Sequence, residues 1–369
     1  MERSRFAGAL FLLGMLVSGA PCAVWAQTPE FGPPLPVPSS LYVLNIPFLH
    51  FGTSDTARLR VGQVRFEADL EYGNTFSHTW QARAYHVGAG IENGPFTRLE
   101  AEYMHREFPS ETMFFLDAEV TRAAIKASVG LPAGLSAGIS IPYISWDAIR
   151  LDGTVEGFHE AIGVADSQRP GFPRGRFQIV LQSPNGPLQF DDRQPEAGLG
   201  DITANIRWGR EVGHASYVSV EVAVKAPTGS PANYRGSGSA DAGVLLGAVH
   251  RFGKRGRFGL HFDASLVIPG RFQNEREITI STAPFSRVLI GSDLRVGHGT
   301  FLSIWGDADQ SPQHRDERGD VSRTAVEFGL GLTRVQPRFG TISLSIVENV
   351  PRFGDAADIA VGLRFRPSL

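Results

Sequence analysis

The residues most able to act on a solute gather between positions 147 and 198. The stretch LDGTVEGFHEAIG places Val155, Phe158 and Ile162 at the i, i+3, i+7 spacing of a short amphipathic helix. Its other side carries carboxylates and an imidazole, at Asp152, Glu156, His159 and Glu160. A proline-stiffened stretch, RPGFPRGR, follows with guanidinium groups at Arg169, Arg174 and Arg176. Charges of both signs at one place suit the binding of a small solute or the constriction of a pore.

Enzymatic chemistry finds less support in the sequence. No H-E-x-x-H pattern occurs, and no G-x-S-x-G forms an elbow between a strand and a helix. The Gly/Ser-rich stretch 227–241 lacks the Lys-Ser/Thr ending of a phosphate loop. A lipid-cleaving barrel needs a serine beside a histidine on its lipid-facing side. On that side only His250 is present, and Ser286 and Ser292 belong to a distant strand. We therefore expect no catalysis, no metal site and no cofactor, with an outer-membrane lipase as the weakest alternative.

The beginning of the chain predicts export. Two arginines in MERSR precede the apolar run Phe6–Val17, which is too short to span a bilayer, and a Val24-x-Ala26 site follows. A signal peptide over residues 1–26 would contain Cys22, the only cysteine, so the mature chain would have no disulfide and no thiolate site. The net charge of −3 and the lack of a basic stripe exclude a nucleic-acid partner.

The rest of the chain alternates between apolar and polar residues. In ITANIRWG, residues 202–209, the apolar side chains occupy every second position, as in a strand with one apolar face. Similar runs of roughly ten to twelve residues recur, which is the length that crosses a bilayer rather than that of an ordinary strand. The predicted strands lie near 57–72, 112–130, 135–146, 199–209, 216–226, 241–252, 257–268, 285–296, 300–308, 321–334, 339–348 and 357–366. In the first two the alternation changes phase, after Gly62 and near Arg122, which predicts a β-bulge in each.

The connections between these strands alternate between long and short. Six long ones, including 73–111 and 147–198, lie on one side, and five short ones, including 131–134 and 297–299, lie on the other. Outer-membrane barrels have this asymmetry and an even number of strands. The sequence therefore predicts an all-β fold, an antiparallel transmembrane β-barrel of twelve strands. Segment 78–107 is expected to form a β-hairpin in an external loop. If this hairpin crosses the membrane instead, the barrel has fourteen strands.

The barrel interior is expected to carry charges of both signs. Charged residues occupy the polar positions of the predicted strands and include Arg207, Arg287, Asp293 and Arg295. Loop 147–198 could fold into the lumen as a plug or constriction and meet these arginines with its carboxylates. The alternative is a salt-bridged loop that stays over the barrel mouth and only gives it shape.

Several phrases carry a family resemblance. The phrases occur in the order FFLDAEVTRAAIKASVGLPAGLSAGISIPYI, LDGTVEGFHEAIGV, GLGDI, VKAPTGS, GSGSADAG and IVENV, and the resemblance covers nearly the whole mature chain. Together they resemble a family of uncharacterised Gram-negative outer-membrane proteins, and more broadly the barrels associated with uptake of hydrophobic or aromatic compounds. The resemblance implies a barrel fold and says little about the solute.

These observations combine into one expectation. A signal peptide (1–26) precedes a periplasmic segment (27–56) and an outer-membrane barrel (57–369), in which loop 147–198 narrows the pore. The expected function is passive passage of a small hydrophobic or polar solute, and the alternative is a non-transporting barrel that displays its loops for adhesion or structure. The expected partners are outer-membrane lipid, lipopolysaccharide and the barrel-assembly machinery.

Overall fold

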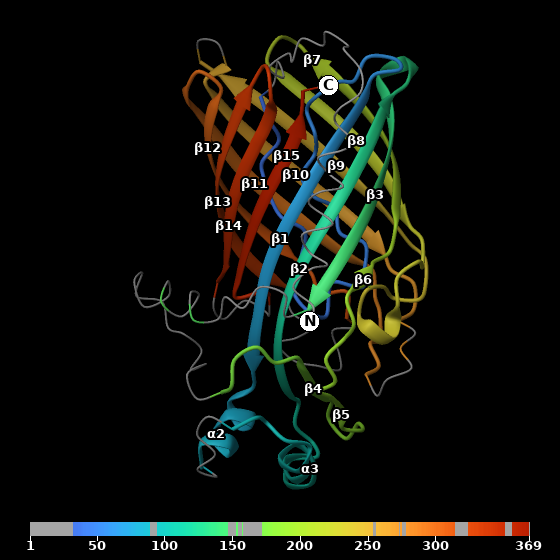
Figure 1. Ribbon diagram of the computed structural model, residues 1–369, viewed down its shortest axis with the longest axis vertical. Coiled ribbons are helices and arrows are strands. Elements are labelled where there is room, and N and C mark those ends of the chain that lie inside the picture. The colour runs from blue at the N-terminus through green and yellow to red at the C-terminus, as the bar shows by residue number, and fades with distance from the viewer. Residues whose placement is uncertain are drawn as a thin grey trace, which may run out of the picture.

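The computed structural model is a closed antiparallel β-barrel of twelve long strands, with a smaller unit projecting from one end (Figure 1). It describes residues 32–88, 94–146, 153, 157, 172–253, 256–272, 274, 278–313, 324–350 and 356–368. Each long strand pairs with its neighbours in sequence, and the first strand closes the ring by pairing with the last. The predicted fold class and strand number are confirmed.

The twelve barrel strands lie close to their predicted positions. They are β1 (Val64–His78), β2 (Met113–Gly130), β3 (Leu135–Trp146), β7 (Thr203–Val212), β8 (Ser216–Lys225), β9 (Asp241–Phe252), β10 (Phe258–Ile268), β11 (Phe285–Gly297), β12 (Thr300–Asp309), β13 (Ala325–Gln336), β14 (Gly340–Asn349) and β15 (Ile359–Pro367). The short connections, such as the single 3-10 turn η1 (Pro132–Gly134), all lie at one end, here called the turn end. The long connections lie at the other end, here called the loop end.

The outer face of the barrel is apolar, as the alternation predicts. Ile206, Ile290 and Phe328 point outward, and 56–57% of the surface of each is exposed. Charged residues such as Asp263 and Asp293 occupy the alternate positions and are buried inside the barrel. A wall with this pattern suits contact with lipid, because a lipid-facing charge near the bilayer centre costs about 2–4 kcal/mol for Arg or Lys.

The two predicted β-bulges are absent from the described strands. β1 and β2 pair without a shift from Val64↔Val129 to His78↔Phe115. Gly62 lies in a turn before β1, where its φ of 77° favours glycine. In β2 the phase stays constant while the inward-facing residues change in character, from Phe114, Leu116, Ala118 and Val120 to Arg122 and Lys126. The prediction was wrong because the lumen itself changes from apolar to charged along β2.

Segment 78–107 forms helices, so the predicted β-hairpin is wrong. Helices α2 (Trp80–Gly88) and α3 (Arg98–Glu107) project beyond the loop end (Figure 1). Thr97 and Glu100 form a reciprocal capping box that begins α3. Strand β4 (Gln178–Gln182) pairs with the extension of β2, and β5 (Gln189–Asp191) pairs with β4. Among the described residues, no helix is both long and apolar enough to cross a bilayer.

Residues 32–60 run through the barrel lumen as a folded-back strap, here called the plug. Its first limb (32–40) starts near the turn end, where Gly32 lies against Arg251. The second limb (49–60) returns there, where Leu59 lies against Gly130. Thr53 and Thr56 of the second limb donate hydroxyl hydrogen bonds to the carbonyls of Leu35 and Gly32, which join the limbs.

The tip of the plug (41–48) reaches the loop-end half of the lumen and is apolar. Leu41, Tyr42, Val43, Leu44 and Phe48 are all at most 4% exposed. They pack in one cluster with wall residues such as Phe285 and Trp305, and each such side chain contributes about 1.5–3 kcal/mol on full burial. The expectation of a periplasmic segment at 27–56 is therefore wrong for residues 32–56, which lie inside the barrel.

Candidate functional site

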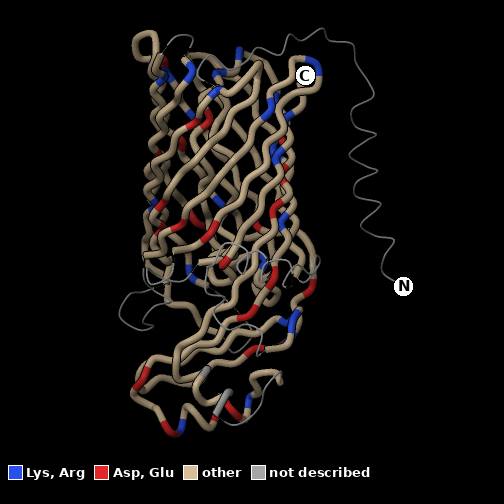
Figure 2. Tube along the Cα trace, turned by 90° about the vertical axis from the view of Figure 1, so that its left-hand side faces the viewer, with Lys and Arg blue, Asp and Glu red and all other residues tan. Residues whose placement is uncertain are grey.

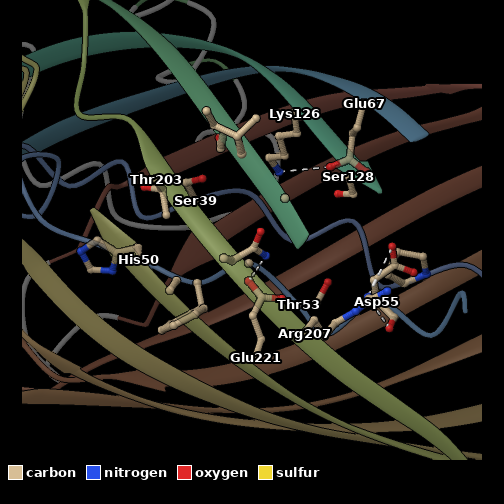
Figure 3. A pocket seen from close by; sticks show the side chains of 18 of the residues that line it. Ser39, His50, Thr53, Asp55, Glu67, Lys126, Ser128, Thr203, Arg207 and Glu221 are labelled. Carbon is tan, nitrogen blue, oxygen red and sulfur yellow. Dashed lines mark hydrogen bonds and ion pairs between the residues drawn. The ribbon is translucent and has the colours of Figure 1, made fainter. Parts of the chain in front are cut away.

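A cavity of about 170 Å³ lies between the second limb of the plug and one side of the barrel wall (Figure 3). Strands β1, β2, β3, β7, β8 and β15 form that side. Basic residues outnumber acidic ones in the lining, which contains Arg65, Arg122, Lys126, Arg207, Arg364 and Arg366 against Asp55, Glu67 and Glu221. The lining also carries many hydroxyl groups, from Ser39, Thr53, Ser128, Ser136, Ser140 and Thr203. We take this cavity as the candidate site, because charged and hydroxyl groups line it on several sides.

A ladder of charges across three strands builds one face of the cavity, here called the basic wall. β1 supplies Glu67, Asp69 and Glu71, and it is flanked by β2 and β15. Lys126 Nζ of β2 lies 3.1 Å from Glu67 Oε1 and 2.5 Å from Asp69 Oδ2.

From the other side of β1, the arginines of β15 complete the ladder. Arg366 Nη2 lies 2.6 Å from Glu67 Oε2, and Arg364 Nε lies 3.0 Å from Asp69 Oδ1. Arg122 Nη1 pairs with Glu71 Oε2 at 2.9 Å. Every second residue of three adjacent strands points inward, so the alternation alone produces this array.

The base of the plug is held by three guanidinium groups around one carboxylate. Asp55 Oδ2 lies 2.6 Å from Arg65 Nη2, 3.2 Å from Arg366 Nη2 and 3.6 Å from Arg207 Nη1. Arg207 also donates to the carbonyls of Asp55 and Ala57. Burial alone would raise the pKa of Asp55, which belongs to the plug and not to a spanning strand. The attraction of Arg366, Arg65 and Arg207 outweighs burial and holds the pKa of Asp55 well below its usual range.

The opposite face of the cavity combines amide, hydroxyl and carboxylate groups. Glu221 of β8 accepts a hydrogen bond from Asn205 of β7 at 2.6 Å, and Figure 3 shows Glu221 across the cavity from Lys126. Gly138 of β3 keeps space open here, since an added Cβ would lie 2.4 Å from Asn205 Oδ1. A solute would therefore meet cations on one side and amide, hydroxyl and carboxylate groups on the other.

A second charged cluster in the lumen, here called the acidic wall, borders a much smaller space. Among the described residues, its one cation is Arg287 of β11, which lies near three acids of β12 and β13, namely Asp307, Asp309 and Glu327. Arg287 Nε lies 2.8 Å from Asp307 Oδ2, and its Nη1 donates to the carbonyl of Phe51 in the plug. Asp307 and Glu327 face each other in register. The plug packs directly against this side, where an added Cβ at Gly331 would lie 2.5 Å from Pro36 Cγ.

The phrases that carry the family resemblance meet at the loop end. Lys225 of VKAPTGS forms a buried ion pair with Asp201 of GLGDI and lies 3.4 Å from Asp241 Oδ2, which follows GSGSA. The same Asp241 Oδ2 accepts from the backbone N–H of Leu49 at 2.8 Å. These residues therefore fasten the plug near its tip, and this was not foreseen from the sequence.

The structure separates the residues singled out in the sequence. Arg207 and Arg287 contact the plug, as described above. Asp293 is buried between Arg251 and His261, while Arg295 lies against the ring of Phe301 at the turn end. Arg174 and Arg176 are exposed. The remaining candidates, Asp152, Glu156, His159, Glu160 and Arg169, lie outside the described residues.

Loop 147–198 is not what fills the described lumen. Its continuous described part, residues 172–198, lies at the loop end, where β4 pairs with β2 (Figure 1). Phe177, Ile179 and Leu181 join the apolar cluster around the plug tip from there. The lumen is filled by residues 32–60 instead, and whether residues 147–171 constrict it stays a prediction.

Sequence reasoning overlooked the basic wall and the plug, although both leave signals. The alternating charges of RFEADLEY in β1 and RFR in β15 mark the ladder. The signal for the plug is the inward-facing glycine. Gly73 would bring an added Cβ to 2.5 Å from Leu41 Cβ, and Gly291 would bring one to 2.5 Å from Leu35 Cδ1. Wall glycines therefore mark the path of the plug.

The register also reveals a serine–histidine pair that the sequence analysis missed. Ser216 of β8 faces His250 of β9, and Ser216 Oγ lies 2.8 Å from His250 Nδ1 at the turn end. Within the described chain, no carboxylate or amide is seen to orient this imidazole, as a catalytic triad requires. The described residues also hold no group of three or more metal-ligating side chains.

Comparisons with known proteins support the fold. No protein-family model matches the chain, and no curated protein matches it in sequence. Among solved structures, it is similar to an outer membrane channel from Pseudomonas putida F1, with a TM-score of 0.53 and 11% identity over 86% of this chain and 99% of that chain. The NanC porin gives a TM-score of 0.41 at 9% identity, covering 82% and 100% of the two chains. The CymD monoaromatic hydrocarbon channel gives 0.39 at 10% identity, covering 94% and 97%. At these identities the first similarity shows a shared outer-membrane barrel fold.

Proposed function

We propose that this protein is an outer-membrane channel for small polar solutes and that the plug controls its opening. The observation that carries the proposal is the polar cavity beside the second limb. The plug fills the apolar half of the lumen densely, yet it leaves charged and hydroxyl groups facing open space near the turn end. A barrel that served only to display loops has no need of such a space.

The orientation follows from the connections. Outer-membrane barrels have short periplasmic turns and long external loops, so the turn end would face the periplasm and the loop end the outside. The apolar tip then closes the external half of the lumen, and the cavity lies on the periplasmic side of this seal. Passage of a polar solute would require the tip to leave its apolar surroundings.

Fastening the plug covalently tests its role. An added Cβ at Gly362 would lie 3.6 Å from Pro38 Cβ, which is within the range of a disulfide, and 2.6 Å from Ser345 Oγ. The variant Pro38→Cys, Ser345→Ala, Gly362→Cys removes the obstructing hydroxyl and ties the first limb to β15. Residues 27–369 contain no other cysteine.

We expect planar bilayers with the oxidised variant to show little conductance, and dithiothreitol to restore the conductance of the unmodified protein. The matched control carries serine in place of both new cysteines and should not respond to dithiothreitol. Equal conductance before and after reduction, with the disulfide verified by mass, would refute gating by the plug. Silence of every form, with barrel folding verified by heat-modifiable migration, would favour the display barrel and its projecting α2–α3 unit.

A further inference from the structure

We infer that the cavity is a binding site for a small anion bearing a carboxylate or phosphate group, and that Lys126 and Arg122 are the residues that receive it. The inference rests on the proposed channel function and specifies its solute. It begins from the order in which charges are layered on the basic wall.

The acids of the basic wall lie deeper than its cations. The exposed fractions of the Glu67, Asp69 and Glu71 side chains are 10%, 1% and 3%. The corresponding values are 30% for Lys126, 17% for Arg122 and 14% for Arg364. The shorter acidic side chains remain close to the wall, and the longer basic side chains cover them. A solute in the cavity therefore meets ammonium and guanidinium groups before it meets the carboxylates beneath.

Lys126 retains hydrogen-bonding capacity. An ammonium group has three donors, and the ion pairs of Lys126 with Glu67 and Asp69 use two of them. Arg122 has five N–H donors and is engaged with Glu71 through Nη1. A planar guanidinium beside an ammonium suits a carboxylate or a phosphate, since both present several acceptor oxygens.

Polar groups around the cations fit the same class of ligand. Ser128, Ser140 and Thr203 line the cavity together with Lys126, and their hydroxyls can donate to further oxygens of an anion. The acidic wall stands apart, because Asp307 does not line the cavity and Asp309 and Glu327 line a separate small space beside the first limb. Glu221 lies across the cavity from Lys126, and its carboxylate disfavours large polyanions that would fill the whole cavity.

Two measurements test the inference, and only one of them needs a conducting channel. The first is the reversal potential of residues 27–369 in a planar bilayer under a potassium chloride gradient. We expect preference for chloride and a fall in that preference of about fivefold in Lys126→Gln, because one nearby unit charge is removed. Lys126→Arg keeps the charge and should restore the preference. Arg334→Gln, which removes a cation from the exposed outer side, should leave it unchanged.

The second measurement is calorimetric titration of the folded protein in detergent micelles with inorganic phosphate, and separately with acetate. Binding of phosphate or acetate that is lost in Lys126→Gln and in Arg122→Gln supports the site. The anion that binds more tightly shows whether the site prefers a phosphate or a carboxylate group. If Lys126→Gln impairs folding, the charge-balanced variant Lys126→Gln, Asp69→Asn replaces it in the titration. This variant should also abolish the binding of phosphate and acetate.

The two outcomes separate the two proposals. A conducting protein without chloride preference and without phosphate or acetate binding overturns the anion site and leaves the channel. A silent protein that binds phosphate or acetate through Lys126 overturns the channel and leaves the anion site. Unchanged selectivity and unchanged binding in Lys126→Gln would also refute the inference.

Discussion

The basic and acidic walls of the lumen contain similar charged side chains in different arrangements. On the basic wall, acids and cations alternate across neighbouring strands, and the cations border open space. On the acidic wall, three carboxylates share one arginine, and the plug lies directly against them. Buried charge by itself therefore does not define a site. Figure 2 shows acidic and basic positions interleaved along much of the barrel, and the cavity selects those that a solute can reach.

The largest difference should come from neutralising two aspartates, Asp55 of the plug, which pairs with Arg366 beside the basic wall, and Asp309 of the acidic wall. Asp55→Asn leaves Arg65, Arg207 and Arg366 without the carboxylate they share, and breaking such a buried pair costs about 3–5 kcal/mol. Asp309→Asn removes one of several crowded acids and should change the free energy of unfolding by less than about 1 kcal/mol. Urea unfolding followed by tryptophan fluorescence measures both. Equal losses would show that the two walls hold the plug equally.

A methyl group added on the acidic wall and one added on the cavity face opposite the basic wall should have opposite effects on conductance. Gly331→Ala places a Cβ 2.5 Å from Pro36 Cγ, so it should push the first limb away at a cost of about 1–3 kcal/mol and increase channel opening. Gly138→Ala adds the same group beside Asn205, at the cavity, and should reduce the current through open channels. Single-channel recordings distinguish the two. A decrease in Gly331→Ala would contradict gating by the plug, and an unchanged current in Gly138→Ala would contradict the assignment of the cavity as the path.

The smallest effect is expected from relieving like charges on the acidic wall. Asp307 and Glu327 are directly opposite each other in neighbouring strands, and like charges in this relation are destabilising. Glu327→Gln should therefore leave stability unchanged or raise it by up to about 1 kcal/mol. Glu67→Gln on the basic wall should lower it, because Lys126, Arg364 and Arg366 all pair with Glu67. Comparison of the two urea midpoints checks this, and stabilisation by Glu67→Gln would argue against the ladder.

Much of the barrel could be predicted because local chemistry repeats along every strand. The side-chain period of two assigned Ile206 and Phe328 to the outside and Arg207 and Asp293 to the inside, and the structure agrees. The prediction failed where a second layer covers a strand. Outside the barrel proper, Met113 and Phe115 of β2 pack on the α2–α3 unit, so both faces of that stretch are apolar and buried. Apolar residues occupy consecutive positions there, and beyond Val120 the inward side becomes charged, so the apolar side chains change phase without a bulge.

The site itself was only partly predictable, because partners far apart in sequence form it. Lys126 of β2 and Arg366 of β15 reach the carboxylate of Glu67 from strands far apart in the sequence, and that proximity exists only once the barrel closes. Arg207 was identified as a lumen residue, but its partner Asp55 was assigned to a segment outside the barrel. Nothing in the local pattern of residues 32–60 states that a lumen will enclose them.

The sequence by itself therefore determined the barrel: strand lengths, strand number, the side that faces lipid and the end that carries long loops. These properties depend on periodicity and spacing, which are local. Tertiary structure alone decided what fills the lumen, which charges pair and where space remains. Those properties depend on how the plug, fastened by Asp55 at its base and through Leu49 to Asp241 near its tip, divides the interior into an apolar seal and a charged cavity.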